Sequence, residues 1–243
     1  MVTEPEAPAG SARRLRFATY NVHGCVGLDG RHDGERVRRV VLDLAADVVA
    51  LQEVDSRAGE ADPWSEIAHD TDYEVIEGPT LHGHRGRYGN ALLTRFPARE
   101  VRSVDLSVAG REPRGAVVAE ILVPRGAPLW VIATHLGLRH AERDVQVARL
   151  ADAIDALPSR GDVVLLGDMN VWRPLRDGLG PLRERLAPGP ALRTFPTQLP
   201  LLALDRVWTR PAQLVERAHV HRSPTSRMAS DHLPLVATLA RPL

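Results

Sequence analysis

Several features that are common in proteins are scarce or missing in this sequence. Only one of its 243 residues is a cysteine, so no disulfide can form within the chain. No apolar run approaches the length of about 20 residues that a membrane-spanning helix requires. Residues 1–14 are rich in Ala, Pro and Glu and lack the apolar core of a signal peptide. We therefore expect residues 1–14 to form a mobile tail and the protein to be cytoplasmic.

Lysine and aromatic residues are also scarce. The sequence contains no lysine, and Phe, Trp and Tyr together make up 4% of it. Its basic and acidic residues balance, so the formal net charge is zero. A protein that holds long DNA by charge alone needs excess cations to neutralise the phosphates. The composition weighs against such a protein, and any basic groove would have to be built from arginine.

The residues that are present favour a sizeable core of mixed α and β structure. Hydrophobic residues make up 44% of the sequence, enough for one large domain or two small ones. Apolar residues at helical spacing predict helices over residues 35–46 and 141–157, with Val145, Ala148, Leu150, Ile154 and Leu157 on the inner side of the second. A short helix is expected near residues 64–69, a polar loop over 77–89, and little regular structure over 173–200.

Apolar runs predict a series of strands. The expected strands cover residues 14–22, 47–55, 101–107, 115–123, 128–136, 163–168, 204–210, 215–222 and 233–240. They occur in antiparallel-looking runs with helices between some of them. This order favours an α+β fold of two packed sheets flanked by helices, in one domain over residues 15–243.

Polar residues with metal-binding or hydrogen-bonding side chains stand where the apolar strands begin or end. Taken singly, each has an ordinary explanation, because Asn and Asp form turns and a histidine beside apolar residues is usually a satisfied core residue. Together they are hard to assign to turns, since the edges of layered sheets are where ligands tend to bind. The set comprises Asn21, Glu53, His135, Asp168, Asn170, Asp205, Asp231 and His232.

The chemistry of this set fits a phosphoester. Mg²⁺ and Mn²⁺ prefer carboxylate oxygens, water and phosphate, and the set has no thiolate cluster that would suit zinc. Hydrolysis at phosphorus needs a cation on the phosphate oxygens, an oriented nucleophile and a stabilised leaving group. Carboxylates, amides and histidines can supply all three.

The order of the motifs resembles that of a known family. "TYNVHG", "LQEVD", "YGNALLTRF", "ATHLG", "LLGDMN", "LDRVW" and "SDHLP" follow one another between residues 16 and 240. This order is similar to that of the endonuclease/exonuclease/phosphatase superfamily, which shares the fold of pancreatic deoxyribonuclease. The resemblance implies a four-layer α/β sandwich of two mixed or antiparallel sheets, and an enzyme that depends on Mg²⁺ or Mn²⁺.

The resemblance also implies roles for individual residues. Glu53 would be the principal metal ligand, with Asn21 nearby and Asp231 completing the metal environment. Asp168 would orient or deprotonate the attacking water, and Asn170 would hold that water or the phosphate. His135 and His232 would bond the phosphate oxygens, and Asp205 would pair with His232. The carboxylate that supports the first histidine in the pancreatic enzyme is absent, which leaves the partner of His135 open.

Further residues are candidates for substrate contact. The resemblance implies a phosphate-binding arginine near Arg114, for which Arg111 competes and a solvated loop charge is the alternative. Tyr88 and Asn90 precede "ALLTRF", where relatives place substrate-contacting groups. Cys25 is expected to be a packing residue rather than a nucleophile, because no base is evidently placed against it. Trp172 lies in a plausible loop, where tryptophans often only pack.

Three functions remain open. The first is a metal-dependent phosphodiesterase acting on a nucleic acid, a nucleotide or a phospholipid headgroup by direct attack of water on phosphorus. The second is a phosphomonoesterase for a small phosphorylated metabolite or inositol phosphate, for which His82, His84, Arg85 and Arg87 are the candidate extra cations. The third is a non-catalytic binding module on the same fold, which ranks last because the expected catalytic residues are all present.

Overall fold

The computed structural model describes residues 14–57, 62–83, 86–124, 127–159, 161–172 and 177–242. Apart from Arg14, which already belongs to the first strand, the expected amino-terminal tail lies outside the described residues. None of the described helices is both long and apolar enough to cross a membrane.

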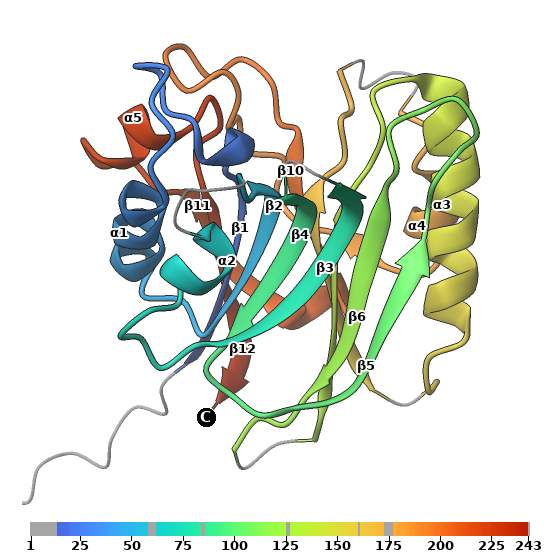
Figure 1. Cartoon of the computed structure of the whole chain (residues 1–243). Coiled ribbons are helices and arrows are strands. Elements are labelled where there is room, and N and C mark those ends of the chain that lie inside the picture. The colour runs from blue at the N-terminus through green and yellow to red at the C-terminus, as the bar shows by residue number, and fades with distance from the viewer. Residues whose placement is uncertain are drawn as a thin grey trace, which may run out of the picture.

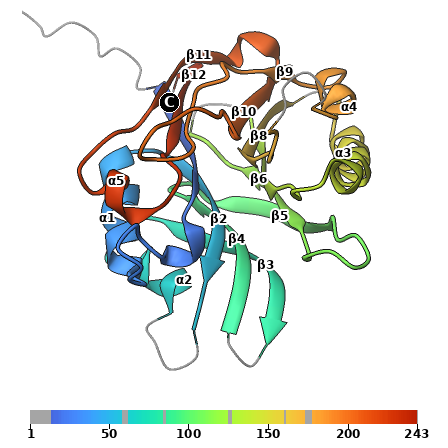
Figure 2. The same ribbon diagram turned by 90° about the horizontal axis from the view of Figure 1, so that it is seen from above.

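The strands form two six-stranded sheets packed face to face (Figures 1 and 2). The first sheet has the order β11-β12-β1-β2-β4-β3, with β1 Arg14–Asn21, β2 Val48–Asp55, β3 Glu74–Gly83, β4 Gly86–Thr94, β11 Val215–Val220 and β12 Leu235–Pro242. The second has the order β5-β6-β7-β8-β10-β9, with β5 Ala98–Asp105, β6 Gly115–Ile121, β7 Leu129–His135, β8 Asp162–Asp168, β9 Ala187–Pro188 and β10 Asp205–Arg210.

Helices cover the outer face of each sheet (Figure 1). Beside the first sheet lie α1 Gly34–Leu44, α2 Pro63–Glu66 and α5 Ser226–Ala229, and beside the second lie α3 His140–Asp155 and α4 Gly180–Arg183. Two 3₁₀ turns, η1 His23–Cys25 and η3 Ala212–Leu214, complete the elements. The expected four-layer sandwich of two mixed sheets flanked by helices is confirmed.

Apolar side chains fill three layers of core. Because successive residues of a strand point to opposite faces, each central strand supplies two of these layers. Phe17, Leu92 and Val131 belong to the layer between the sheets. Tyr20 and Val49 face α1 on one outer side, and a corresponding cluster packs beneath α3 on the other. The sheets are thereby held at a fixed separation, which fixes the distance between side chains at their edges.

Each sheet contains one parallel strand pair joined by a helix. Strands β1 and β2 are parallel, with α1 between them in sequence, and β7 and β8 are parallel, with α3 between them. The other pairs are antiparallel. Asp33 caps α1 by accepting a hydrogen bond from the backbone N–H of Arg36. The carboxyl ends of both parallel pairs carry predicted site residues, Asn21 and Glu53 in one sheet and His135 and Asp168 in the other.

Two predictions from the sequence differ from the structure. Residues 77–89 belong largely to the hairpin of β3 and β4, not to a loop. The stretch is polar and contains Pro79, but β3 is an edge strand, where proline's missing N–H is tolerated. In α3, Val145 is 41% exposed and Ala148 is exposed as well, whereas Gln146 is buried. Gln146 accepts a hydrogen bond from the backbone N–H of Gly137, so a polar side chain takes the inner position in order to hold the loop after His135.

Candidate active site

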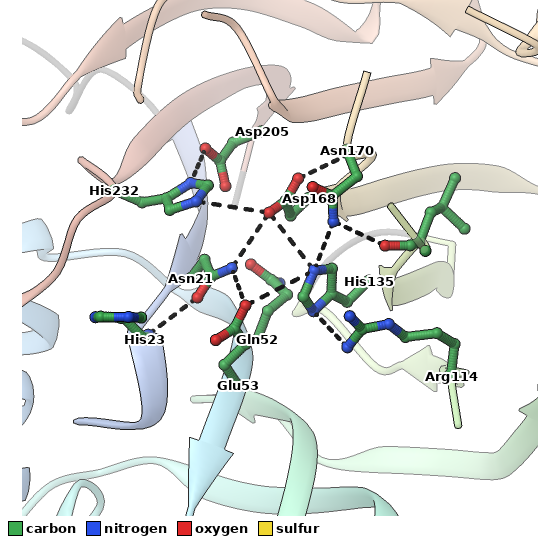
Figure 3. A network of polar contacts seen from close by, with 12 residues as sticks. Asn21, His23, Gln52, Glu53, Arg114, His135, Asp168, Asn170, Asp205 and His232 are labelled. Carbon is green, nitrogen blue, oxygen red and sulfur yellow. Dashed lines mark hydrogen bonds and ion pairs between the residues drawn. The ribbon is translucent and has the colours of Figure 1, made fainter. Parts of the chain in front are cut away.

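The predicted site residues come together at one edge of the sandwich, where the two sheets face each other (Figure 3). Asn21 and Glu53 come from the first sheet, and His135 and Asp168 come from the second. The Asn21 side chain bridges the sheets. Its amide Nδ2 donates to Glu53 Oε1 in the same sheet at 2.9 Å and to Asp168 Oδ2 in the other sheet at 3.2 Å. Residues 147 positions apart in the sequence thus share one hydrogen-bond network.

A bulge in β2 places Glu53 at the site. The pairing of β2 with β4 shifts register between Leu51 and Val54, and Glu53 adopts a left-handed backbone conformation with φ of 59°. Bulges of this kind re-aim a side chain at the end of a strand and are common beside functional sites. The Glu53 side chain is 23% exposed, more than the other carboxylates of the network. It is the one that presents an accessible oxygen.

The orientation of Asn21 differs from what a metal ligand requires. Its Oδ1 accepts a hydrogen bond of 3.0 Å from the backbone N–H of His23, which leaves Nδ2 facing the two carboxylates. A donor, not an oxygen, therefore points toward Glu53 and Asp168. The residue is close to the expected metal environment, but in this orientation it orders the carboxylates.

Asp168 lies at the centre of the network and is almost completely buried. Its Oδ1 accepts the backbone N–H of Asn170 at 2.8 Å, and its Oδ2 lies 3.6 Å from His135 Nε2 and 3.7 Å from His232 Nε2. Burial, followed by the like charge of Asp205, raises the pKa of Asp168 to about 6. A carboxylate with such a pKa is basic enough to accept a proton from water near neutral pH.

His232 forms an ion pair with Asp205. Its Nδ1 is 2.9 Å from Asp205 Oδ2, which also accepts the hydroxyl of Thr194. Burial alone would lower the pKa of His232, but the Asp205 and Asp168 carboxylates raise it to about 10. Both ring nitrogens face a carboxylate, so His232 is an imidazolium at neutral pH. The expected pairing of Asp205 with His232 is present in this geometry.

His135 is buried and uncharged, in contrast to His232. Burial, followed by the charges of Arg114 and His232, holds its pKa well below the usual value. Two donors approach the ring: Arg114 Nη1 lies 3.3 Å from Nδ1, and Asn170 Nδ2 lies 2.9 Å from Nε2. A neutral imidazole accepts at only one nitrogen, so it cannot satisfy both donors. One donor remains available for another acceptor at the site.

Arg114, rather than Arg111, reaches the network. Its side chain is 7% exposed, and Nη1 also donates to Glu112 Oε1 at 2.9 Å. The Nε atom is buried without a hydrogen-bond partner among the described residues. Tyr88 lies beside it: burial and the nearby Glu53 raise the pKa of the phenol, and Arg114 hydrogen-bonds to it. Tyr88 therefore stays protonated and can donate a hydrogen bond.

Other candidates lie at the margin of the network or outside it. Asp231 follows Ser230, whose hydroxyl donates to the Asn21 carbonyl, and Asp231 Oδ1 is 4.0 Å from His23 Nδ1. The Asn90 amide donates to the Gly115 carbonyl at 3.0 Å and ties β4 to β6. Cys25 is buried, and burial raises the pKa of its thiol to about 12, as a packing cysteine requires.

The proposed basic cluster of residues 82–87 is only partly visible. His84 and Arg85 lie outside the described residues. Arg87 forms ion pairs with Asp62, at 2.7 Å, and with Glu77. Its charge is already compensated by two carboxylates, which leaves little of it for a substrate phosphate.

The structure adds two aromatic residues that sequence reasoning left unassigned. Trp172 Nε1 donates to Asn170 Oδ1 at 3.2 Å and thereby fixes which side of the Asn170 amide faces His135. The Phe195 ring contacts both Trp172 and His232: its centroid lies 5.4 Å from that of the Trp172 ring and 4.8 Å from that of the His232 ring. Only the position of Trp172 two residues after Asn170 could have suggested this role. Phe195 belongs to a Thr-Phe-Pro segment that resembles one in bacterial relatives and predicts a rim beside the site, but nothing in that segment predicts its contact with the His232 ring.

Comparisons with known proteins identify the family to which the chain belongs. The sequence model of the Endonuclease/Exonuclease/phosphatase family matches residues 18–232. The Escherichia coli K12 protein named "Uncharacterized protein YbhP" is 36% identical over 248 residues, which cover 93% of this chain and 96% of that protein.

Solved structures share the fold. An endonuclease/exonuclease/phosphatase from Beutenbergia cavernae superposes with a TM-score of 0.75 at 26% identity, covering 93% of this chain and 72% of the other. D. rerio TDP2 complexed with single strand DNA product gives a TM-score of 0.70 at 20% identity, covering 94% and 99%. The family model spans most of the chain and the E. coli relative nearly all of it, so the protein belongs to the endonuclease/exonuclease/phosphatase family.

Proposed function

We propose that this protein is a divalent-metal-dependent phosphodiesterase that activates water for direct attack on phosphorus. Members of its family generally hydrolyse phosphoesters. The observation that carries the proposal is the single network in which Asn21, Glu53, His135, Asp168 and His232 meet across the two sheets. This network places a neutral imidazole and a charged imidazole 3.6 Å and 3.7 Å from the same oxygen of a basic carboxylate.

A surplus of donors supports an anionic substrate. Arg114 and Asn170 compete for one imidazole, and Arg114 Nε has no partner among the described residues. Buried donors without acceptors are costly, by roughly 1–3 kcal/mol each. A phosphate, which carries only acceptor oxygens, would satisfy them.

The residues fit a hard divalent cation. Glu53 offers a partly exposed carboxylate, and Asp205 Oδ1 is buried with no donor among the described residues. Asp168, Asp205 and His232 bring ligand atoms within 4.8 Å of one another. However, His232 is protonated between the two carboxylates and has no lone pair to give. We therefore assign the metal to Glu53, with Asp231 as the expected second carboxylate and Asn21 ordering the carboxylates of the network. When bound, Mg²⁺ or Mn²⁺ would polarise the phosphate.

The side chains of the chain itself supply the remaining roles. Asp168 orients the attacking water and accepts its proton, since its pKa lies near neutrality. Asn170 holds the water or a phosphate oxygen. The His232 imidazolium, fixed by Asp205, and His135, together with Arg114 and Tyr88, donate hydrogen bonds to the phosphate and its ester oxygens. No side chain becomes covalently attached to phosphorus.

The substrate is a nucleic acid, a nucleotide or a phospholipid headgroup. D. rerio TDP2, which has the same fold, is described in complex with a single strand DNA product, and this supports a nucleic acid as one candidate. The phosphomonoesterase alternative is weaker, because Arg87, one of its proposed extra cations, is paired with acidic residues. A non-catalytic role is weaker still, because the network has every group that hydrolysis needs.

The test is hydrolysis of bis(4-nitrophenyl) phosphate and nicking of supercoiled plasmid with Mg²⁺ or Mn²⁺, each repeated with EDTA. We expect metal-dependent turnover that is lost in Asp168→Ala and kept in the matched surface variant Asp152→Ala. Nicking would identify DNA as a substrate, whereas turnover of the small diester alone would direct the search to lipid headgroups and nucleotides. Turnover that survives EDTA or Asp168→Ala would contradict the proposal.

A further inference from the structure

A cavity lined in part by Arg114 adjoins the site. It has a volume of about 230 Å³ and lies between β3 of the first sheet and β5 and β6 of the second, strands that run beside one another in Figure 1. Residues 78–80, 103–105 and 114–116, with Ser107, line it. Arg114 belongs to both places, because it lines the cavity and its Nη1 contacts His135. A ligand held at His135 could therefore extend into this cavity.

The strand register places the cavity at the same level as the site. Asp105 pairs with Gly115, Ala116 pairs with Thr134, and His135 pairs with Asp168. Asp105 and His135 thus lie at the same end of the second sheet, on strands β5 and β7, with β6 between them. Neighbouring strands are about 4.8 Å apart, so roughly 10 Å separates the two residues. This span suits a phosphate with one small group on its ester oxygen.

Gly115 keeps the space between them open. A Cβ atom at this position would lie 3.2 Å from Thr80 Cγ2 and 3.3 Å from the Val104 carbonyl, tighter than ordinary contacts. With no side chain there, the cavity is walled by Thr80 on one side and by Asp105 and Ser107 on the other.

Apart from the Arg114 guanidinium, which is a donor, the Thr80, Asp105 and Ser107 side chains of these walls present acceptors. The Thr80 hydroxyl donates to the Tyr88 carbonyl, and the Ser107 hydroxyl donates to the Arg114 carbonyl, each at 3.4 Å. Both hydroxyl hydrogens are engaged, so the oxygen lone pairs remain for a ligand. Asp105 Oδ1 accepts the backbone N–H of Ser107 at 2.8 Å, which leaves Oδ2 as a further acceptor. A ligand that fits must bring hydrogen-bond donors.

This requirement selects among phosphoesters. A second phosphate would bring only acceptors and would stand beside the Asp105 carboxylate. A plain alkyl or aryl group would leave the polar walls unpaired. A sugar ring or a small polyol brings several hydroxyl donors without charge.

We propose that this cavity binds a hydroxyl-bearing group, a sugar or a polyol, that is esterified to the phosphate held at the active site. The proposal rests on the proposed function, since it takes the phosphate to lie beside His135 and Arg114. It narrows the substrate to phosphodiesters in which one alcohol carries further free hydroxyls near the phosphate.

The test is direct binding, measured by calorimetry in buffer containing Mg²⁺, of glycerol 1-phosphate against propyl phosphate. The two ligands differ only in hydroxyls. We expect the wild-type protein to prefer glycerol phosphate about 10-fold, as the hydrogen bonds donated by its two free hydroxyls predict. The double variant Thr80→Val with Asp105→Ala should abolish the preference and leave the affinity for propyl phosphate unchanged. Asp144→Ala, on the exposed side of α3, is the control. Ribose 5-phosphate in the same assay distinguishes a sugar from a polyol.

Hydrolysis of bis(4-nitrophenyl) phosphate is measured in parallel, because neither substitution touches the reacting groups. The double variant should keep this activity. Equal affinity of the wild-type protein for the two ligands, no binding of either, or a preference that survives in the double variant would each overturn the proposal. Loss of the proposed function has a separate signature: a binding preference in a protein that hydrolyses no diester.

Discussion

At the scale of single residues, the site sets two histidines and two aspartates in different states through their surroundings. His232 lies between two carboxylates and is charged, whereas His135 lies beside Arg114 and is neutral. Asp205 is fixed by Thr194 and His232, whereas Asp168 has the raised pKa of a buried base. Pairs of titratable groups whose surroundings push their pKa values apart are a feature of acid–base sites.

We expect Asp168→Asn to lower kcat by about 1,000-fold or more, because the variant keeps the shape of the side chain and loses the base. Its melting temperature should change little, because two effects oppose each other. The amide removes the free energy that the ionised buried carboxylate costs the folded state at neutral pH, but it can accept only one of the hydrogen bonds that the carboxylate accepts from Asn170 and Asn21. Thermal denaturation in EDTA, alongside the kinetics, measures both effects. An unfolded variant, or one with full activity, would refute the role of Asp168.

The imidazolium of His232 predicts an alkaline loss of stability. Its pKa is raised in the folded state to about 10, so its contribution is complete below the unfolded pKa of about 6.5 and is lost as pH rises through 10. Burial also raises the pKa values of Cys25 and the three tyrosines, so these groups reduce stability at alkaline pH as well, but they contribute equally to the wild-type protein and to His232→Gln.

The measurement is the melting temperature of the metal-free protein from pH 6 to pH 10, compared with that of His232→Gln. We expect the wild-type advantage over the variant to shrink across this range. Parallel curves for the two proteins would show that the pair contributes no such charge-dependent stability.

At the scale of elements, the parallel pair of β7 and β8 depends on a glycine. Gly167 has a φ of 154°, and a Cβ atom there would lie 1.9 Å from the Thr134 carbonyl. We expect Gly167→Ala to destabilise the fold by about 3 kcal/mol or more, since it combines backbone strain with a clash in the sheet.

The variant Gly110→Ala separates the effect of backbone strain on stability from the effect of a steric clash. Gly110 also has a positive φ, 73°, but nothing lies within 4 Å of its Cβ position. Strain alone should cost about 1 kcal/mol there. Urea denaturation of both variants measures the difference, and equal losses would mean that the close approach of β8 to β7 is not what demands glycine.

Elements were predicted best from the sequence where the residues of a single strand or helix show the apolar pattern of that element. Apolar runs ending in Asn21, Glu53, His135 and Asp168 marked both the strands and the edge at which they meet. The hairpin of β3 and β4 was missed, because Pro79 is acceptable only on an edge strand, and edge position is a property of the sheet. The partner of His135 was missed for a similar reason: Arg114, which directly precedes β6, comes close to His135 only after β6 has paired with β7.

At the scale of the whole molecule, the two ends of the described chain lie together. Arg14 of β1 pairs with Pro242 of β12, at the edge of the sandwich opposite the site. We expect a circular permutant that joins residue 242 to residue 14 through a short glycine linker, with new ends between β6 and β7, to fold and to keep its hydrolytic activity. Circular dichroism, melting temperature and diester hydrolysis test this. An insoluble or inactive permutant would show that connectivity, and not only strand pairing, holds the site.

The strands of the second sheet lie between those of the first in the sequence, and this arrangement determines which sheet can form first during synthesis on the ribosome. The second sheet is a contiguous stretch of chain, Ala98–Arg210, and can assemble while the remainder is still being made. The first sheet cannot close, because β12 must insert between β1 and β11. Until β12 leaves the ribosome, one edge of β1 is unpaired and can pair with strands of other nascent chains. His232 leaves the ribosome only just before that strand, so a product of interrupted translation has an incomplete site.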